Sequence, residues 1–183
     1  MKNSIFNNIT ILVFLITSLA FQACKKDSPP NPNEQELITT VKLSFVDQNG
    51  TESVYQWHDI DGAGGNNPII DTIRLTEGAI YVMTVSFLDE SKNPVQDITS
   101  EIKDESESHL ILASADNNLN LQFIIQDKDD KNLPLGLTQI VQLGTKGSGN
   151  INLLLLHQSD KTSSDPATTG ETDIEVKFPA IVQ

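Results

Sequence analysis

Apolar and polar residues alternate along most of the chain beyond residue 37, and this period of two predicts β-strands. The segments 38–46, 150–157 and 171–182 show the alternation most clearly. The segment 80–88 is partly apolar on both of its faces, which is typical of a central strand. Turn signals such as Asn49-Gly50 separate these segments. Together they predict about nine short strands.

One segment has a helical pattern instead. Residues 98–108 follow Asp97 and contain Thr99, either of which can act as the N-cap, and Glu101 adds a negative charge to the first turn. A chain of many short strands with so little helix predicts an all-β fold. We expect an Ig-like antiparallel β-sandwich of about 7–9 strands with at most one short helix.

The first 23 residues have the pattern of an export signal. Lys2 precedes an apolar run over 9–21, which is too short to cross a bilayer because a spanning helix needs about 20 apolar residues. Ala23 and then Cys24, the only cysteine of the chain, follow this run. An odd thiol in an exported chain needs an explanation. Either Cys24 is modified, or an ordinary signal is cut elsewhere and Cys24 has no role.

The apolar run that ends in Ala23-Cys24 resembles the lipobox of bacterial lipoproteins, although Phe21 and Gln22 differ from the residues that this family prefers. The resemblance implies that Cys24 becomes the N-terminus and carries acyl chains such as palmitate. Each buried methylene contributes about 0.8 kcal/mol, so two or three acyl chains would hold the protein on a membrane.

The chain then divides into three parts. We expect a signal peptide over 1–23, the lipidated Cys24 with a flexible Pro-rich tether over 24–33, and a β-sandwich domain over 34–183. The whole chain has a net charge of −13. Because acidic surfaces repel phosphates, nucleic acid is disfavoured as a partner. The acidity agrees either with solubility or with attraction of cations or of a basic partner.

Three sets of residues are candidates for a metal site. Asp59 and Asp61 lie in a Gly-rich segment whose carboxylates can surround a hard cation such as Ca²⁺. Residues 127–132 (DKDDKN) resemble half of a calcium loop, although a hairpin turn also explains them. His109, at the end of an acidic segment, and His157 can bind Zn²⁺ with nearby carboxylates. Their spacing is not a zinc signature, and histidines at strand ends also make local hydrogen bonds.

Enzyme motifs are absent from the sequence. It contains no Gly-x-Ser-x-Gly elbow, no phosphate-binding loop of the type Gly-x-x-x-x-Gly-Lys-Ser/Thr and no His-Glu-x-x-His. We therefore expect no catalysis, and no cofactor other than a metal ion, either Ca²⁺ or Zn²⁺.

Several short motifs run through the domain. They are Trp57-x-Asp59, Leu75-x-x-Gly78-x-x-Tyr81, Phe87-Leu88-Asp89-Glu90-Ser91, Asp97-Ile98-Thr99, Pro134-Leu135-Gly136-Leu137 and Gly170-Glu171-Thr172-Asp173-Ile174. Together they resemble small, acidic, lipid-anchored outer-membrane proteins of Gram-negative bacteria, a family with no settled activity. Some small surface lipoproteins work with TonB-dependent transporters, so the resemblance implies an outer-membrane protein or transporter as a partner.

The sequence therefore predicts a noncatalytic, lipid-anchored binding or accessory module at the outer membrane, on its periplasmic or its surface side. The alternative is a metal-binding or metal-uptake lipoprotein that uses His109, His157 and carboxylates such as those of Asp59 and Asp61.

Overall fold

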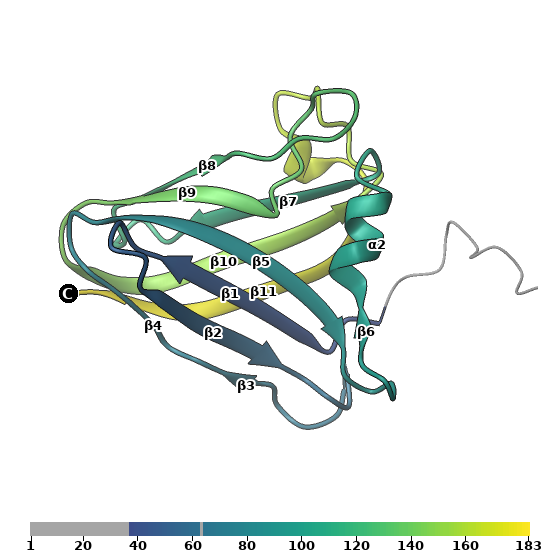
Figure 1. Cartoon of the computed structure of the whole chain (residues 1–183), viewed down its shortest axis with the longest axis horizontal. Helices are drawn as coiled ribbons and strands as arrows, with labels where there is room; N and C mark the ends of the chain where they lie inside the picture. Colours follow the sequence, from purple (N-terminus) through teal and green to yellow (C-terminus); the bar gives the residue numbers. More distant parts are fainter. Residues whose placement is uncertain (1–36, 63) are drawn as a thin grey trace, which may run out of the picture. The chain divides into compact units, whose positions relative to one another are not determined.

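The computed structural model describes residues 37–62 and 64–183, which form a sandwich of two β-sheets (Figure 1). All of them belong to one compact unit, Gln35–Gln183. The predicted signal peptide, Cys24 and the tether lie outside the described residues. Within the described part, no helix is long and apolar enough to cross a membrane.

The first sheet has seven strands, all paired antiparallel, in the order β3-β2-β1-β5-β9-β8, with β6 paired to β5. The strands are β1 (Thr40–Val46), β2 (Glu52–His58), β3 (Ile69–Ile70), β5 (Ile80–Asp89), β6 (Gln96–Asp97), β8 (Leu121–Ile125) and β9 (Thr138–Leu143). β5 lies between β1 and β9, as its apolar residues on both faces predicted.

The second sheet has four strands in the order β4-β11-β10-β7. They are β4 (Ile73–Leu75), β7 (His109–Ala115), β10 (Gly147–His157) and β11 (Glu171–Val182). β4 pairs parallel to β11, and the other pairs are antiparallel. The segment 69–75, which the sequence predicts as one strand, is divided between the sheets. Asp71 ends the first part by exchanging hydrogen bonds with the backbone of Gln56, and the chain then crosses to the second sheet.

The alternation of each strand produces the core between the sheets. In β1 and β5, every second residue points inward, and Phe45, Met83 and Phe87 are completely buried. Leu153 of β10 and Phe178 of β11 are buried from the opposite sheet. Each such side chain contributes roughly 1.5–3 kcal/mol by leaving water. The all-β sandwich expected from the sequence is confirmed. The strands outnumber the prediction because the segment 69–75 is divided into β3 and β4, and because β6, with two residues, has too short a pattern to detect.

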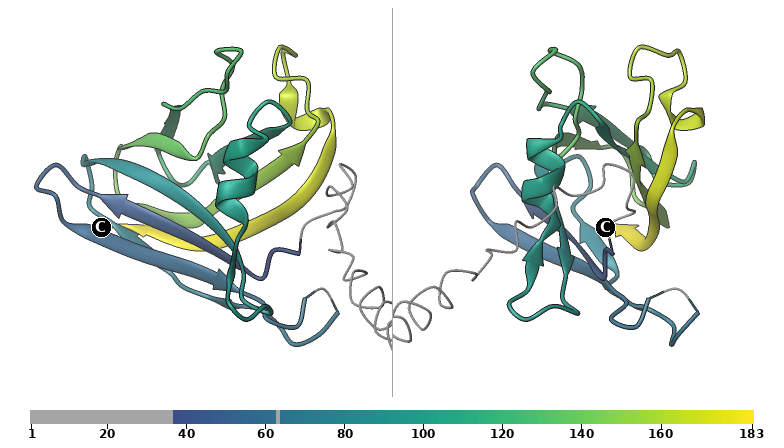
Figure 2. Two further views of the ribbon diagram at one scale, coloured as in Figure 1. Left: turned by 45° about the vertical axis from the view of Figure 1, so that its right-hand side comes forward. Right: turned by 90° about the vertical axis from the view of Figure 1, so that its right-hand side faces the viewer.

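The α-helix of the described part, α2 (Ile98–Asp104), connects β6 of the first sheet to β7 of the second and lies at one end of the sandwich (Figures 1 and 2). Ile98 and Ile102 anchor it in the core. The Thr99 hydroxyl accepts a hydrogen bond from the backbone N–H of Phe87 and donates one to the carbonyl of the same residue. The helix ends four residues earlier than predicted, because the chain turns over residues 105–108 to enter β7.

Candidate metal site at the helix end of the sandwich

The end of α2 positions the first residue of the site. Asp97 is the N-cap, and its side chain accepts a hydrogen bond from the backbone N–H of Thr99, as its residue type predicted. Glu105 is the C-cap, and its backbone N–H donates to the carbonyl of Glu101. The Glu105 carbonyl accepts from Ser108, which closes the turn into β7. The chain therefore returns to the helix end within four residues, where His109 begins the strand.

His109 and His157 lie directly opposite each other in the antiparallel pair of β7 and β10. Residues opposite in such a pair project to the same face of the sheet. The same face carries Ile111 opposite Leu155, both in the core, so the two imidazoles point to the interior side of the sheet. Their rings stack with centroids 4.9 Å apart and planes at 10°. His109 is 3% exposed, and His157 is half-buried.

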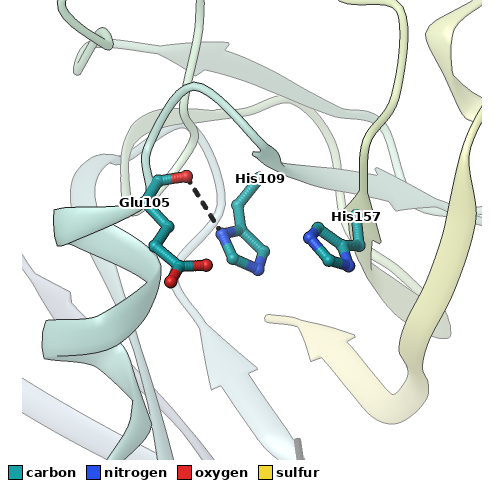
Figure 3. Close-up of side chains that lie close together, drawn as sticks. All are labelled: Glu105, His109 and His157. Atoms are coloured by element: carbon teal, nitrogen blue, oxygen red, sulfur yellow. Dashed lines mark hydrogen bonds between the residues drawn. The ribbon is translucent and has the colours of Figure 1, made fainter. Parts of the chain in front are cut away.

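Glu105 completes a cluster of three possible ligands. One ligand atom from each of Glu105, His109 and His157 lies within 4.8 Å of the other two. Figure 3 shows the Glu105 side chain reaching from the helix end towards the His109 ring, with His157 on the other side of that ring. The carboxylate is exposed, whereas the histidines belong to paired strands. The cluster thus consists of two histidines held on paired strands and one solvent-exposed carboxylate.

Asp173 approaches the same cluster from β11. The register of β10 and β11 places Leu155 opposite Ile174 but Leu156 opposite Thr172, so that Asp173 is the additional residue of a β-bulge. A bulge bends the strand and re-aims a side chain. The Asp173 side chain is 9% exposed, and its Oδ2 lies 3.8 Å from Nε2 of His109.

The hydrogen bond of His109 decides which of its nitrogens can bind a ligand. Nδ1 lies 3.2 Å from the backbone oxygen of Glu105 (Figure 3). A carbonyl oxygen only accepts, so Nδ1 carries the proton, and Nε2 of the neutral ring has a free lone pair. A histidine that binds a metal usually makes such a bond with its other nitrogen, which fixes the ring's orientation.

Burial shifts both ionisable groups of this pair towards their neutral forms. Burial lowers the pKa of His109, and the neighbouring His157 lowers it further, against the Glu105 carbonyl and Asp173, which raise it. Burial raises the pKa of Asp173, although both imidazoles oppose this. His109 is therefore unprotonated over a wider pH range than a free histidine, and only an unprotonated imidazole binds a metal.

A buried ion pair joins three loops next to the cluster. The ammonium of Lys161, in the β10–β11 loop, lies 2.8 Å from Oδ2 of Asp129 in the β8–β9 loop. It also donates to the carbonyl of Ser106, next to Glu105, at 2.7 Å. Nearby, the exposed Lys131 pairs with Glu107 at 2.8 Å. The positions of these loops therefore depend on one another.

The metal-ligand candidates predicted from the sequence lie in two separate places in the structure. His109 and His157 come together although they are far apart in sequence, because β7 and β10 are neighbours. Asp59 and Asp61 do not join them, since they follow β2, near the far edge of the other sheet. There the Asp61 carboxylate accepts hydrogen bonds from the backbone and side chain of Asn66. Its oxygens are used to hold the loop.

The segment 127–132 is a hairpin connection rather than half of a calcium loop. Asp127 accepts hydrogen bonds from the backbone N–H groups of Gly136 and Leu137. Asp129 accepts from two backbone N–H groups within its own turn and binds Lys161. The ammonium is where a cation would have to sit, so the turn interpretation accounts for this segment.

Sequence reasoning did not single out Glu105 as a possible ligand or Asp173 as a neighbour of the cluster. The spacing of Glu105 and His109 by four residues was the available signal for the first, because one helical turn brings such residues together. Asp173 had no local signal, since only the bulge brings it inward.

Comparison with protein-family models, with curated proteins and with solved structures found no match for this chain.

Proposed function

We propose that this protein is a noncatalytic binding module that holds one divalent transition-metal ion at the Glu105–His109–His157 cluster. The observation that carries the proposal is the convergence of two inward-facing imidazoles and a carboxylate at the end of the sandwich. Imidazole nitrogen suits zinc, copper and nickel, whereas calcium prefers 6–8 oxygen ligands. Zn²⁺ is therefore the ion that we propose, in place of Ca²⁺.

The distances support an ion of this size. Zinc bonds to imidazole nitrogen and carboxylate oxygen are about 2.0–2.2 Å, so two ligands of one tetrahedral ion lie about 3.3–3.6 Å apart. The ligand atoms of the cluster lie within 4.8 Å of one another, so binding of an ion shortens the widest of these separations by at most about 1.5 Å. The exposed Glu105 side chain can supply this movement at little cost, because it is not packed in the core.

Titration of the purified full chain with Zn²⁺, against a chromophoric competitor, tests the proposal. We expect one ion per chain, and a loss of affinity of at least a hundredfold in His109→Ala and in His157→Ala. His58→Ala is the matched control, because His58 is the third histidine and its Nδ1 is 2.8 Å from the Thr40 hydroxyl in the other sheet. A wild-type chain that binds no zinc, or equal losses in all three variants, would refute the proposal.

We propose further that acyl chains on Cys24 hold this module at the outer membrane of a bacterial envelope. The support is the sequence pattern of residues 1–24 alone. Mass spectrometry of the mature protein tests it. We expect an N-terminal Cys24 carrying acyl chains, and a Cys24→Ala protein that no longer fractionates with membranes. An unacylated mature N-terminus would contradict the anchor without affecting the metal site.

A further inference from the structure

The strands at the edges of the two sheets differ in how far their outer backbone groups are covered. β3 and β4 have two and three residues, so they present little free edge. The edge of β7 is covered in part, because the N–H of Ile111 donates to the carbonyl of Leu135 at 2.7 Å. β8 has five residues and lies at the margin of the first sheet (Figure 1). Of the edges that the structure describes, that of β8 is the one of more than three residues with no bonded neighbouring segment.

Backbone hydrogen bonds determine which residues of β8 face this free edge. At one end of the strand, the N–H of Gln126 donates to the carbonyl of Thr138. At the other end, the carbonyl of Asn120 accepts from the N–H of Gly144. Bonding alternates along an antiparallel pair, so the even-numbered residues of β8 bond to β9. Residues 121, 123 and 125 therefore turn their N–H and carbonyl groups to the free edge.

Two of these six edge groups already have partners within the chain. The N–H of Leu121 donates to the carbonyl of Leu119 at 2.9 Å, and the carbonyl of Ile125 accepts from the side chain of Gln126 at 3.3 Å. Two donors remain, the N–H groups of Phe123 and Ile125, and two acceptors remain, the carbonyls of Leu121 and Phe123. A twofold axis through Phe123 aligns each remaining donor with a remaining acceptor of a second copy.

We infer that β8 pairs with β8 of a second copy of this chain, antiparallel and around a twofold axis at Phe123. The N–H of each Phe123 donates to the carbonyl of the other, and the N–H of each Ile125 donates to the Leu121 carbonyl of the other copy. The neighbouring antiparallel registers use the occupied Leu121 N–H or the occupied Ile125 carbonyl instead. The inference goes beyond the proposed function, since neither the metal cluster nor the anchor takes part.

The distribution of charge favours a second copy as the occupant of this edge. The chain has a net charge of −13, so its charged surface attracts basic partners. Edge strands usually carry charged residues or proline that prevent pairing, and β8 has neither. In the proposed pair, Gln122 lies opposite Ile124 and Leu121 opposite Ile125, so no like charges oppose each other. The outward residues of β8 and β9 are also uncharged: Gln122, Ile124, Thr138, Ile140 and Gln142.

The size of the contact predicts a weak, reversible pair. A strand edge about 17 Å long and about 10 Å deep is far smaller than the roughly 800 Å² that each partner buries in a standard interface. We therefore expect an equilibrium between monomer and dimer that depends on protein concentration.

Sedimentation velocity of the full chain over a range of concentrations is the first part of the test. Cys24→Ala is the background, so that neither acyl chains nor a disulfide at Cys24 links two copies. We expect dimers to appear as the concentration rises, and Ile125→Pro to raise the dimer dissociation constant at least tenfold relative to Ile125→Ala. Proline removes the edge N–H and is tolerated on an edge strand, whereas alanine shortens the side chain but keeps the N–H. A chain that stays monomeric at every concentration, or equal dissociation constants for the two variants, overturns the inference.

Disulfide formation in the same background is the second part, and it does not depend on the proline variant. Only a residue on the twofold axis lies opposite itself, with Cα atoms about 5.5 Å apart, which is within the range of a disulfide. We expect Phe123→Cys to form a linked dimer in a glutathione redox buffer, with circular dichroism unchanged. Ile124→Cys is the matched control, because Ile124 is exposed whereas Phe123 is half-buried, but it lies opposite Gln122. Random collision links the more exposed thiol faster, so cross-linking of Phe123→Cys no faster than that of Ile124→Cys overturns the inference.

Discussion

Removal of one partner from the buried ion pair of Lys161 and Asp129 should lower stability by an unusually large amount for a loop contact. Their side chains are 2% and 1% exposed, and Nζ lies 2.8 Å from Oδ2. The same ammonium donates to the Ser106 carbonyl. Replacement of Lys161 by Met keeps most of the aliphatic side chain but removes the charge and both hydrogen bonds.

The expected loss of unfolding free energy follows from the groups that lose their partner in the Lys161→Met variant. Asp129 keeps two backbone hydrogen bonds to Oδ1, but its Oδ2 and the Ser106 carbonyl lose their buried donor. Removal of one partner from a buried pair costs about 3–5 kcal/mol. With a urea dependence of about 2 kcal/mol per M for a domain of this size, the unfolding midpoint should fall by about 2 M.

Lys131→Met is the matched control, because the Lys131–Glu107 pair differs from the Lys161–Asp129 pair mainly in its burial. Lys131 also pairs with a carboxylate at 2.8 Å, that of Glu107, between the β8–β9 loop and the turn after α2, but the side chains are 66% and 47% exposed. Exposed pairs contribute little because water screens them, so its midpoint should move by less than about 0.5 M. Urea unfolding followed by circular dichroism measures both. Equal shifts in the two variants, or a shift below 0.5 M for Lys161→Met, would refute this reasoning.

Three further predictions follow from neighbouring contacts. Burial raises the pKa of Asp129, but hydrogen bonds from the ammonium of its partner and from the backbone outweigh this and hold the pKa below its usual value. The pair therefore stabilises the fold above about pH 4, and this contribution is lost as the pH falls through the folded-state pKa. The loss of unfolding free energy between pH 7 and pH 3 should be smaller in the methionine variant than in wild type, and equal losses would contradict this. Asp97→Ala should lower the unfolding free energy by about 1 kcal/mol through loss of the N-cap, and an unchanged urea midpoint would count against the cap. Gly170→Ala should destabilise the protein and weaken zinc binding, because a Cβ there would lie 2.4 Å from the carbonyl oxygen of His157. Gly78→Ala has a similar positive φ with nothing within 4 Å, so it should lower stability by about 1–2 kcal/mol and leave zinc affinity unchanged.

The local pattern of apolar and polar residues was sufficient to predict the class of fold. Alternation identified the long strands, including the central β5 and the last strand, β11, at its observed bounds. Asp97, one of the two N-cap residues that the pattern allowed, is the observed N-cap, and this could be predicted because capping depends on residues next to one another. The histidines His109 and His157 could be named as candidates because imidazole is a metal ligand wherever it occurs.

The site itself was decided by contacts between distant segments. The register of β7 and β10 brings His109 opposite His157, the bulge in β11 turns Asp173 inward, and the packing of three loops gives Asp129 a lysine where the sequence suggested calcium. Asp59 and Asp61, which looked equally suitable in sequence, are on the other sheet. A strand's own pattern shows which residues face inward, but its register and partners depend on the burial of the whole core, and that information is not local.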